Sequence, residues 1–89
     1  MDKFTEITDE MHELYIKKNS DYGESVTNTY KDFGLVSFLV RMQDKLNRLK
    51  TLNKKDSQVK DESIRDTLVD LANYAILAVI ELDKEKEDL

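Results

Sequence analysis

The sequence predicts an all-α protein, a compact helical bundle of three long helices plus a short one, completed by oligomerisation. Its 89 residues include no proline and only two glycines, the two residue types that most disfavour helix interiors. Apolar side chains recur at spacings of three and four residues, which is typical of helices that pack one face on a core. The last segment is more apolar than two partner helices can cover, so we expect at least a dimer.

The first helix is predicted over residues 3–18, with Asp2 as its N-cap. Its buried stripe is expected to consist of Phe4, Ile7, Met11, Leu14 and Tyr15. Residues 19–25 read NSDYGES, and Asn, Ser, Asp and Gly favour turns for distinct local reasons. This segment is therefore predicted to be the clearest break in the chain.

Residues 26–33 are expected to form a short, weak helix or an ordered loop, which Gly34 ends as a C-terminal cap. The second long helix is predicted over residues 35–52. Its apolar seam consists of Leu35, Phe38, Leu39, Met42, Leu46, Leu49 and Leu52. Residues 53–60 form a polar connection.

The last helix is predicted to begin near Asp61, as its N-cap, and to continue to about Lys86. Between residues 71 and 80 only Asn73 is polar. A helix that is apolar all round must be surrounded by other elements, and this is the basis for expecting a second copy. Residues 83–89 form a charged tail that is expected to fray.

Composition limits the function classes. The length allows a single domain over residues 1–89, and the absence of cysteine excludes disulfides and thiolate zinc sites. A net charge of −5 argues against non-specific binding of duplex nucleic acid. No signal peptide pattern is visible, and no apolar stretch approaches the ~18 residues that span a bilayer. We therefore expect a cytoplasmic protein with no membrane partner.

Three acidic residues of the last predicted helix, Glu62, Asp66 and Asp70, are spaced four residues apart. Each step rotates only about 40° around a helix axis, so the three side chains share one stripe. Like charges at this spacing repel each other, and Asp70 lies within the apolar segment, where an unpaired carboxylate is costly. A bound Mg²⁺ would compensate this charge, because it prefers oxygen ligands and commonly joins carboxylates to substrate phosphates.

Basic side chains offer a second way to neutralise this acidic row. Arg41, Lys45 and Arg48 follow one flank of the second long helix, with Asp44 among them. A plain salt-bridge network is therefore an open alternative to a metal site. The two readings are compatible, since an acidic stripe that holds Mg²⁺ opposite a basic stripe that holds phosphate is a common way to build a metal–nucleotide site.

The Asp21-Tyr22-Gly23 turn is a second candidate feature. Tyr22 is suited to stacking on a base, and Lys17 precedes the turn within reach of a phosphate. Alternatively, Asp21 caps a helix, Tyr22 fills the core and Gly23 supplies a positive φ. The Glu10 and Glu13 row of the first helix is expected to be a solvated face, or else to supply extra metal ligands across a dimer.

Three motifs carry a family resemblance. They are KKNSDYGES at 17–25, FG at 33–34 followed by RMQDKLNRL at 41–49, and ESIRDTLVDLANYA at 62–75. In this order they resemble the small phage and bacterial family called nucleotide-modification-associated domain 1, over roughly residues 4–82. The resemblance implies an association with nucleotide metabolism, and for a phage-encoded chain it places the protein in the bacterial host cell.

The last-helix pattern also looks like that of the all-α nucleoside triphosphate pyrophosphohydrolases, the group of MazG and the dimeric dUTPases. This likeness implies a helical bundle that binds Mg²⁺ through acidic pairs and cleaves between the α and β phosphates. Asp66 and Asp70 match the acidic positions of the later helix, and Glu62 matches more loosely. The chain departs from the group on the preceding helix, which offers only Asp44 where an ExxE pair is expected.

The sequence thus predicts a Mg²⁺-dependent nucleotide-binding protein, with NTP or dNTP pyrophosphohydrolysis as its possible reaction. Asp66 and Asp70 are the candidate catalytic residues, and the expected metal ligands are Asp44, Glu62, Asp66 and Asp70. The expected nucleotide-binding residues are Lys17, Asp21, Tyr22, Arg41, Lys45, Arg48 and Asn73. Two alternatives stay open: a non-catalytic phage protein that sequesters a nucleotide of host defence, and a structural helical domain that binds other proteins.

Overall fold

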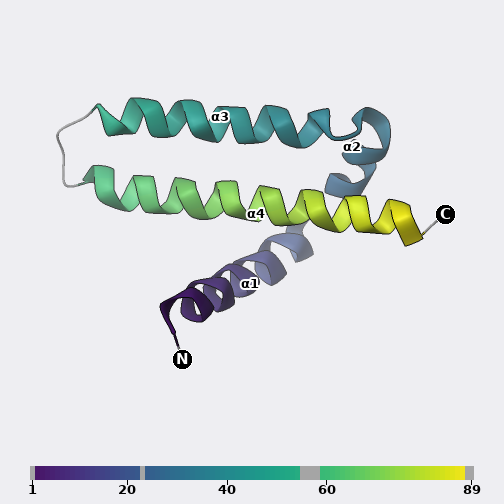
Figure 1. The fold of residues 1–89 in the computed structure, drawn as a ribbon, viewed down its shortest axis with the longest axis horizontal. Helices are drawn as coiled ribbons and strands as arrows, with labels where there is room; N and C mark the ends of the chain where they lie inside the picture. The colour runs from purple at the N-terminus through teal and green to yellow at the C-terminus, as the bar shows by residue number, and fades with distance from the viewer. Residues whose placement is uncertain (1, 23, 55–58, 88–89) are drawn as a thin grey trace.

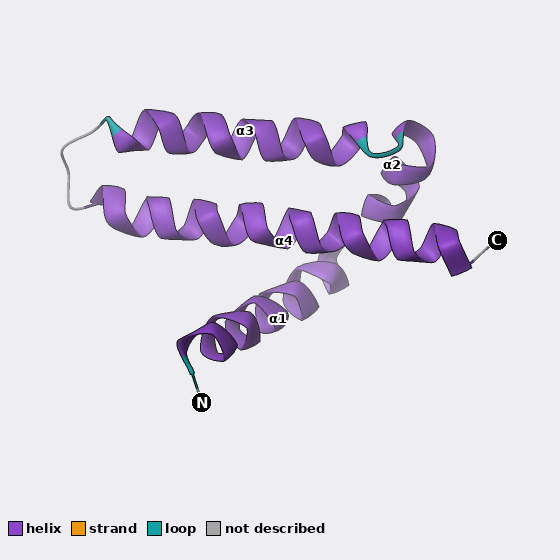
Figure 2. Cartoon of the chain, viewed as in Figure 1, coloured by secondary structure: helices purple, strands orange, loops and turns teal. Residues whose placement is uncertain are grey.

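The structure, a computed structural model, describes residues 2–22, 24–54 and 59–87, with the side chains of 21, 22 and 59–61 left out. All regular structure in these segments is α-helical (Figure 2). The helices are α1 (Lys3–Tyr22), α2 (Ser25–Phe33), α3 (Val36–Asn53) and α4 (Val59–Glu87). The predicted all-α fold, with three long helices and a short one, is confirmed.

The two longest helices of the C-terminal part form the frame of the molecule. α3 and α4 run antiparallel and lie side by side along most of their length (Figure 1). α2 folds back at one end of this pair, and α1 crosses obliquely beneath α4, with few contacts between them. The arrangement leaves a space bordered by all four helices near the junction of α1 and α2.

The start of α1 is as predicted, but its end is not. The backbone N–H of Thr5 donates to Asp2 Oδ1 at 2.7 Å, so Asp2 is the N-cap, and these hydrogen bonds lower the pKa of Asp2. The helix continues into the segment predicted as a break, residues 19–25, and ends within it at Tyr22. Ser20 accounts for part of this difference, because its hydroxyl donates to the Lys17 carbonyl at 2.8 Å inside the helix instead of competing with it.

Gly34 ends α2 as predicted. Its φ is +71°, and its N–H donates to the Tyr30 carbonyl at 2.7 Å. The chain then turns directly into α3, which begins at Val36. The corner between α2 and α3 therefore depends on a backbone conformation that L-residues rarely adopt.

One prediction for the last helix is wrong. α4 begins at Val59, so Asp61 lies inside the helix and is not its N-cap. The helix includes the charged residues up to Glu87, the last residue that the structure describes there, and the fraying of this segment stays a prediction. Lys84 pairs with Glu81 at 3.4 Å, and Lys84 and Lys86 place positive charge at the negative end of the helix dipole.

The core is small for a chain of this length. Phe38 is only 2 % exposed and packs with Tyr30 and Ala78, the two aromatic rings lying 5.9 Å apart. Met11 is the buried member of the predicted α1 stripe, whereas Phe4 is 79 % exposed. The seam predicted on α3 is likewise buried at Phe38 and half exposed at Leu39. Much of the predicted core is therefore not covered by the residues that the structure describes.

None of the helices in the described segments is long and apolar enough to cross a membrane.

Candidate functional site

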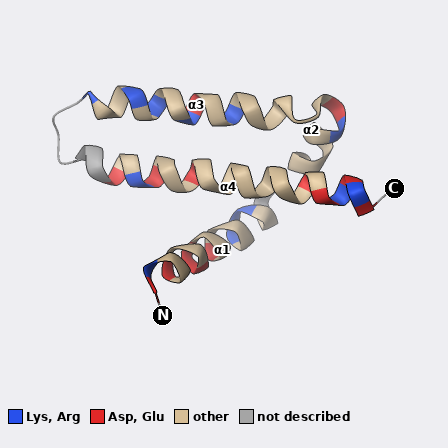
Figure 3. Ribbon diagram, viewed as in Figure 1, with Lys and Arg blue, Asp and Glu red and all other residues tan. Residues whose placement is uncertain are grey.

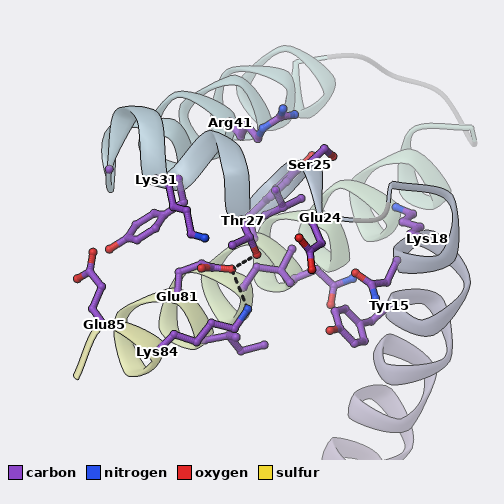
Figure 4. A pocket seen from close by; sticks show the side chains of 18 of the residues that line it. Tyr15, Lys18, Glu24, Ser25, Thr27, Lys31, Arg41, Glu81, Lys84 and Glu85 are labelled. Atoms are coloured by element: carbon purple, nitrogen blue, oxygen red, sulfur yellow. Dashed lines mark hydrogen bonds and ion pairs between the residues drawn. The ribbon is translucent and has the colours of Figure 1, made fainter. Parts of the chain in front are cut away.

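A cavity of about 1020 Å³ lies along one face of α4 and takes side chains from all four helices (Figure 4). Its α4 lining residues recur every three or four positions, so they come from one helical face. They are Asp70, Asn73, Tyr74, Leu77, Ile80, Glu81, Lys84, Glu85 and Glu87. The volume is at the upper end of what sites for small ligands and cofactors occupy.

One end of this cavity carries an excess of positive charge. Asp70 receives two ammonium groups, Lys18 Nζ of α1 at 3.3 Å and Lys45 Nζ of α3 at 3.4 Å. One turn before Lys45, the Arg41 guanidinium lies 5.8 Å from the centroid of the Tyr74 ring, in a cation–π contact. Two lysines thus share one carboxylate and an arginine lines the same cavity, an arrangement that attracts a further anion. We call Lys18, Arg41, Lys45 and Asp70 the basic end.

The opposite end of the cavity is acidic. Glu81 is only 6 % exposed, its Oε1 accepts a hydrogen bond from Thr27 Oγ1 at 2.7 Å, and Lys84 Nζ lies 3.4 Å from the same oxygen (Figure 4). A hydrogen bond to Glu85 raises the pKa of Tyr30, as do burial and the charges of Glu85 and Glu81. We call Thr27, Tyr30, Glu81, Lys84 and Glu85 the acidic end.

A second cavity, of about 620 Å³, lies between α1 and α4. Carboxylates from both helices line it, Glu10 and Glu13 from α1 and Asp66 from α4, together with Arg65, whose guanidinium pairs with Glu10 at 3.0 Å. Lys17, Lys18 and Asp70 complete its polar lining. Figure 3 shows acidic positions along α1 and α4 and basic positions along α3, which in this view lies on the other side of α4 from α1.

The structure brings part of the predicted site together. Arg41, Lys45, Asp70 and Asn73 line the first cavity. Lys17 and Asp66 line the second, which Asp70 also borders. The side chains of Asp21 and Tyr22 fall outside the described residues.

Three other predicted residues lie away from both cavities. Arg48 Nε donates to Thr67 Oγ1 at 3.2 Å, and this buried hydroxyl donates in turn to the Ser63 carbonyl at 2.7 Å. Arg48 therefore links α3 to α4. Asp44 and Glu62 are exposed and border neither cavity.

The predicted set of four metal ligands is not gathered in the described part of this chain, where no three His, Asp or Glu side chains lie close enough to hold one ion. Glu62 and Asp70 are eight residues apart, which is about 12 Å along a helix and too far for both to ligate one cation directly. The salt-bridge alternative describes Asp70 better, because two lysines neutralise it. A cavity nevertheless remains beside these ion pairs.

The acidic end was not predicted from the sequence. Glu81 follows Asp70 by eleven residues, about three helical turns, so the two carboxylates share one face of α4. The residues between them are mostly apolar, so the two carboxylates were not considered together. Thr27 and Tyr30 were missed because nothing in their local sequence indicates that α2 folds back onto α4.

Comparison with known proteins identifies the family. No curated protein and no solved structure matches the chain. The family described as nucleotide modification associated domain 1 matches residues 18–82, most of the chain. The matched segment includes all four residues of the basic end, together with Glu81. The chain therefore belongs to the nucleotide modification associated domain 1 family.

Proposed function

We propose that the protein binds a nucleotide in the larger cavity, with its phosphates at the basic end. The observation that carries this proposal is the pairing of Lys18 and Lys45 with the single carboxylate of Asp70, with Arg41 beside them on the Tyr74 ring. Asp70 keeps the two ammonium groups oriented before a ligand arrives. A phosphate accepts hydrogen bonds from both lysines and a bidentate contact from arginine, and such charge-assisted bonds are about twice as strong as neutral ones.

The middle of the cavity suits the sugar and the base. Asn73 carries both a donor and an acceptor, and Tyr74 and Tyr15 supply aromatic surface on which a base can stack. The family description, which concerns nucleotide modification, supports the same ligand class.

Mg²⁺ is part of the proposal as a companion of the nucleotide. The described carboxylates do not form a metal cage, but Mg²⁺ often uses only one or two carboxylates and takes its other ligands from phosphates and water. Asp70, at the basic end, and Asp66, one turn away on α4, are the carboxylates available for this purpose.

A second candidate function is pyrophosphohydrolysis of a nucleoside triphosphate. The observation that favours it is the second cavity, where Glu10 and Glu13 of α1 face the same space as Asp66 and Asp70 of α4. Acidic pairs on two helices are what the resemblance to the all-α pyrophosphohydrolases implies. Binding without cleavage is nevertheless the first candidate, because Asp70 and Glu10 are already paired with cations.

Thermal shift with linear and cyclic nucleotides, with and without Mg²⁺, tests the binding proposal. A ligand at one hundred times its Kd stabilises the folded state by about 2.7 kcal/mol, which is readily measured as a rise in Tm. Lys45→Ala removes a charge-assisted contact, so the variant should need at least about tenfold more ligand for the same rise in Tm. Lys50→Ala is the matched control, because Lys50 is an exposed lysine of α3 that borders neither cavity. If no nucleotide raises Tm at millimolar concentration, the protein-binding alternative replaces this proposal.

Release of pyrophosphate from NTPs and dNTPs with Mg²⁺ separates the two candidates. Hydrolysis that Asp66→Asn abolishes would establish the enzyme, and the exposed position of Asp66 makes misfolding of the variant a minor concern. Nucleotides that bind and are recovered intact would establish a binding protein, such as one that sequesters a nucleotide of host defence.

A further inference from the structure

A buried carboxylate at the acidic end has one oxygen fixed and one oxygen open. Thr27 Oγ1 and Lys84 Nζ both contact Oε1 of Glu81, at 2.7 Å and 3.4 Å. No donor among the described residues contacts Oε2. The described part of the chain also contains no fully buried side-chain nitrogen or oxygen without a partner, and Glu81 lines the cavity. Oε2 therefore keeps some accessible surface and is an unused acceptor at this end of the cavity.

The polar atoms around Glu81 form an ordered array. Lys84 Nζ is a donor, and it lies 3.4 Å from Oε1 of the Glu81 carboxylate. Thr27 of α2 donates to the same oxygen, so Thr27 and Lys84 both lie beside the carboxylate (Figure 4). Each carboxylate oxygen has two lone pairs, so a ligand that takes Lys84 Nζ away from Oε1 meets one donor, the second acceptor position of Oε1 and the open Oε2.

We propose that Glu81 and Lys84 recognise the Watson–Crick edge of guanine, so that the cavity selects a guanine nucleotide; this inference rests on the proposed function. Guanine presents the acceptor O6 beside the donors N1–H and N2–H, which is the complement of Lys84 followed by the carboxylate. Adenine and cytosine would each place a ring-nitrogen acceptor against the carboxylate, and uracil has a single N–H between two carbonyl groups. A buried acceptor that is left unpaired is costly, so these mismatches discriminate strongly.

The distance between the two ends of the cavity agrees with this ligand. Asp70 and Glu81 lie eleven residues apart on α4, which is about 16 Å along the helix axis. This separation suits a nucleotide that carries more than one phosphate, with the phosphates near Asp70 and the base edge near Glu81. The charges also agree, because the phosphates meet cations and the N–H groups of the base meet a carboxylate.

Binding of GTP, ITP and ATP to the full chain, measured by calorimetry, tests the proposal. ITP has the guanine O6 and N1–H but lacks the N2 amine. We expect ITP to bind about tenfold more weakly than GTP, the effect of one hydrogen bond to a charged group, and ATP to bind more weakly still. Equal affinities for the three nucleotides would overturn the guanine inference and leave nucleotide binding standing, whereas failure of all three to bind would overturn both.

Two variants test which side chain contacts which atoms of the base. Glu81→Gln should remove the preference for GTP over ITP and raise the relative affinity for ATP, because an amide can pair with the donor and the acceptor of adenine. Lys84→Ala should weaken GTP and ITP by the same factor, since both carry O6, and should leave ATP unchanged. Lys86→Ala, which alters an exposed lysine outside the cavity, should change nothing.

The Lys84→Ala variant keeps the proposal testable if the Glu81→Gln variant fails to fold. Its side chain is half exposed, so Lys84→Ala should fold even if the buried Glu81→Gln variant does not, and circular dichroism will show which variants are intact. A Lys84→Ala protein that folds and keeps its GTP affinity would contradict the assignment of O6 to Lys84 and with it the proposed array.

Discussion

At the scale of single residues, Tyr30 has a pH dependence with a defined sign. Its hydrogen bond to Glu85, its burial and the neighbouring carboxylates raise its pKa above the ordinary value of 10.0. The folded state therefore favours the neutral phenol. This stabilisation is complete below pH 10.0 and is lost as the pH rises through the raised pKa of the folded protein.

Tyr30→Phe tests this dependence, because it keeps the ring against Phe38 and removes the titrating hydroxyl. Between about pH 8 and 11, the Tm of the wild-type protein should fall more steeply than that of the variant. Circular dichroism at matched ionic strength measures both curves. Parallel curves would show that other groups account for the alkaline loss of stability.

The sequence correctly predicted which side chains lie together where helical periodicity alone determines the direction in which they point. Arg41 and Lys45 are one turn apart on α3, and both do line the cavity with Asp70. Arg48 points within about 20° of Arg41 around the helix, but it lies about 10 Å further along the axis, where it contacts Thr67 instead of the cavity. Which member of a charged row borders a cavity depends on what the neighbouring helix presents at that height, and the sequence of one helix does not contain that information.

At the scale of the elements, the corner at Gly34 is the feature most open to test. Its φ of +71° and ψ of −156° fall in a region that is essentially restricted to glycine. A Cβ at this position would meet no atom within 4 Å, so the cost of a side chain is backbone strain alone.

Gly34→Ala should therefore lower the free energy of unfolding by about 1–3 kcal/mol without removing any packing contact. Urea denaturation followed by circular dichroism measures this loss. Ser37→Ala is a useful comparison, because it removes a hydroxyl that donates to the Gly34 carbonyl at 2.9 Å and leaves the φ angle unchanged. A smaller loss for Gly34→Ala than for Ser37→Ala would contradict the strain argument.

Element types were predictable, whereas some ends were not. Proline and glycine scarcity with a 3.6-residue period is enough to predict four helices, and a glycine in the right place predicted the end of α2. The end of α1 was predicted four residues too early, because turn-forming residues are tolerated in a last helical turn when their side chains bond within it, as Ser20 does. The start of α4 was missed for a similar reason, since an aspartate near a helix start suits several positions of the first turn.

At the scale of the whole molecule, the chain exposes more surface than a compact monomer of the same mass. Its accessible area is 6979 Å², whereas a compact monomer of 10.4 kDa exposes about 5,400 Å². Its radius of gyration, 14.9 Å, likewise exceeds the ~12 Å expected for this length. The excess area is about twice what one partner buries in a standard interface, and Phe33, Val36, Val40 and Val79 lie exposed on it.

We therefore expect the protein to self-associate, as the sequence analysis predicted from the apolar last helix. Light scattering after size exclusion should give at least twice the chain mass. Replacing Val40 and Val79 together with glutamate should lower that mass, because each introduces a charge on an exposed apolar position, while Lys50→Glu should not. A wild-type protein of monomer mass at micromolar concentration would refute the expectation.

The ion pairs at Asp70 have a mechanical consequence for α1. This helix contacts α4 through few residues, and Met11 is its one buried side chain among those described. Much of its attachment therefore depends on the pair of Lys18 with Asp70 and that of Arg65 with Glu10, both of which water and salt can reach. At 1 M NaCl, where charges are screened beyond about 3 Å, amide hydrogen exchange should quicken in α1 and stay slow where α3 packs on α4. An anion that pulled Lys18 away from Asp70 would loosen α1 as salt does, so a ligand leaves α1 in place only when it binds Lys18 together with Asp70.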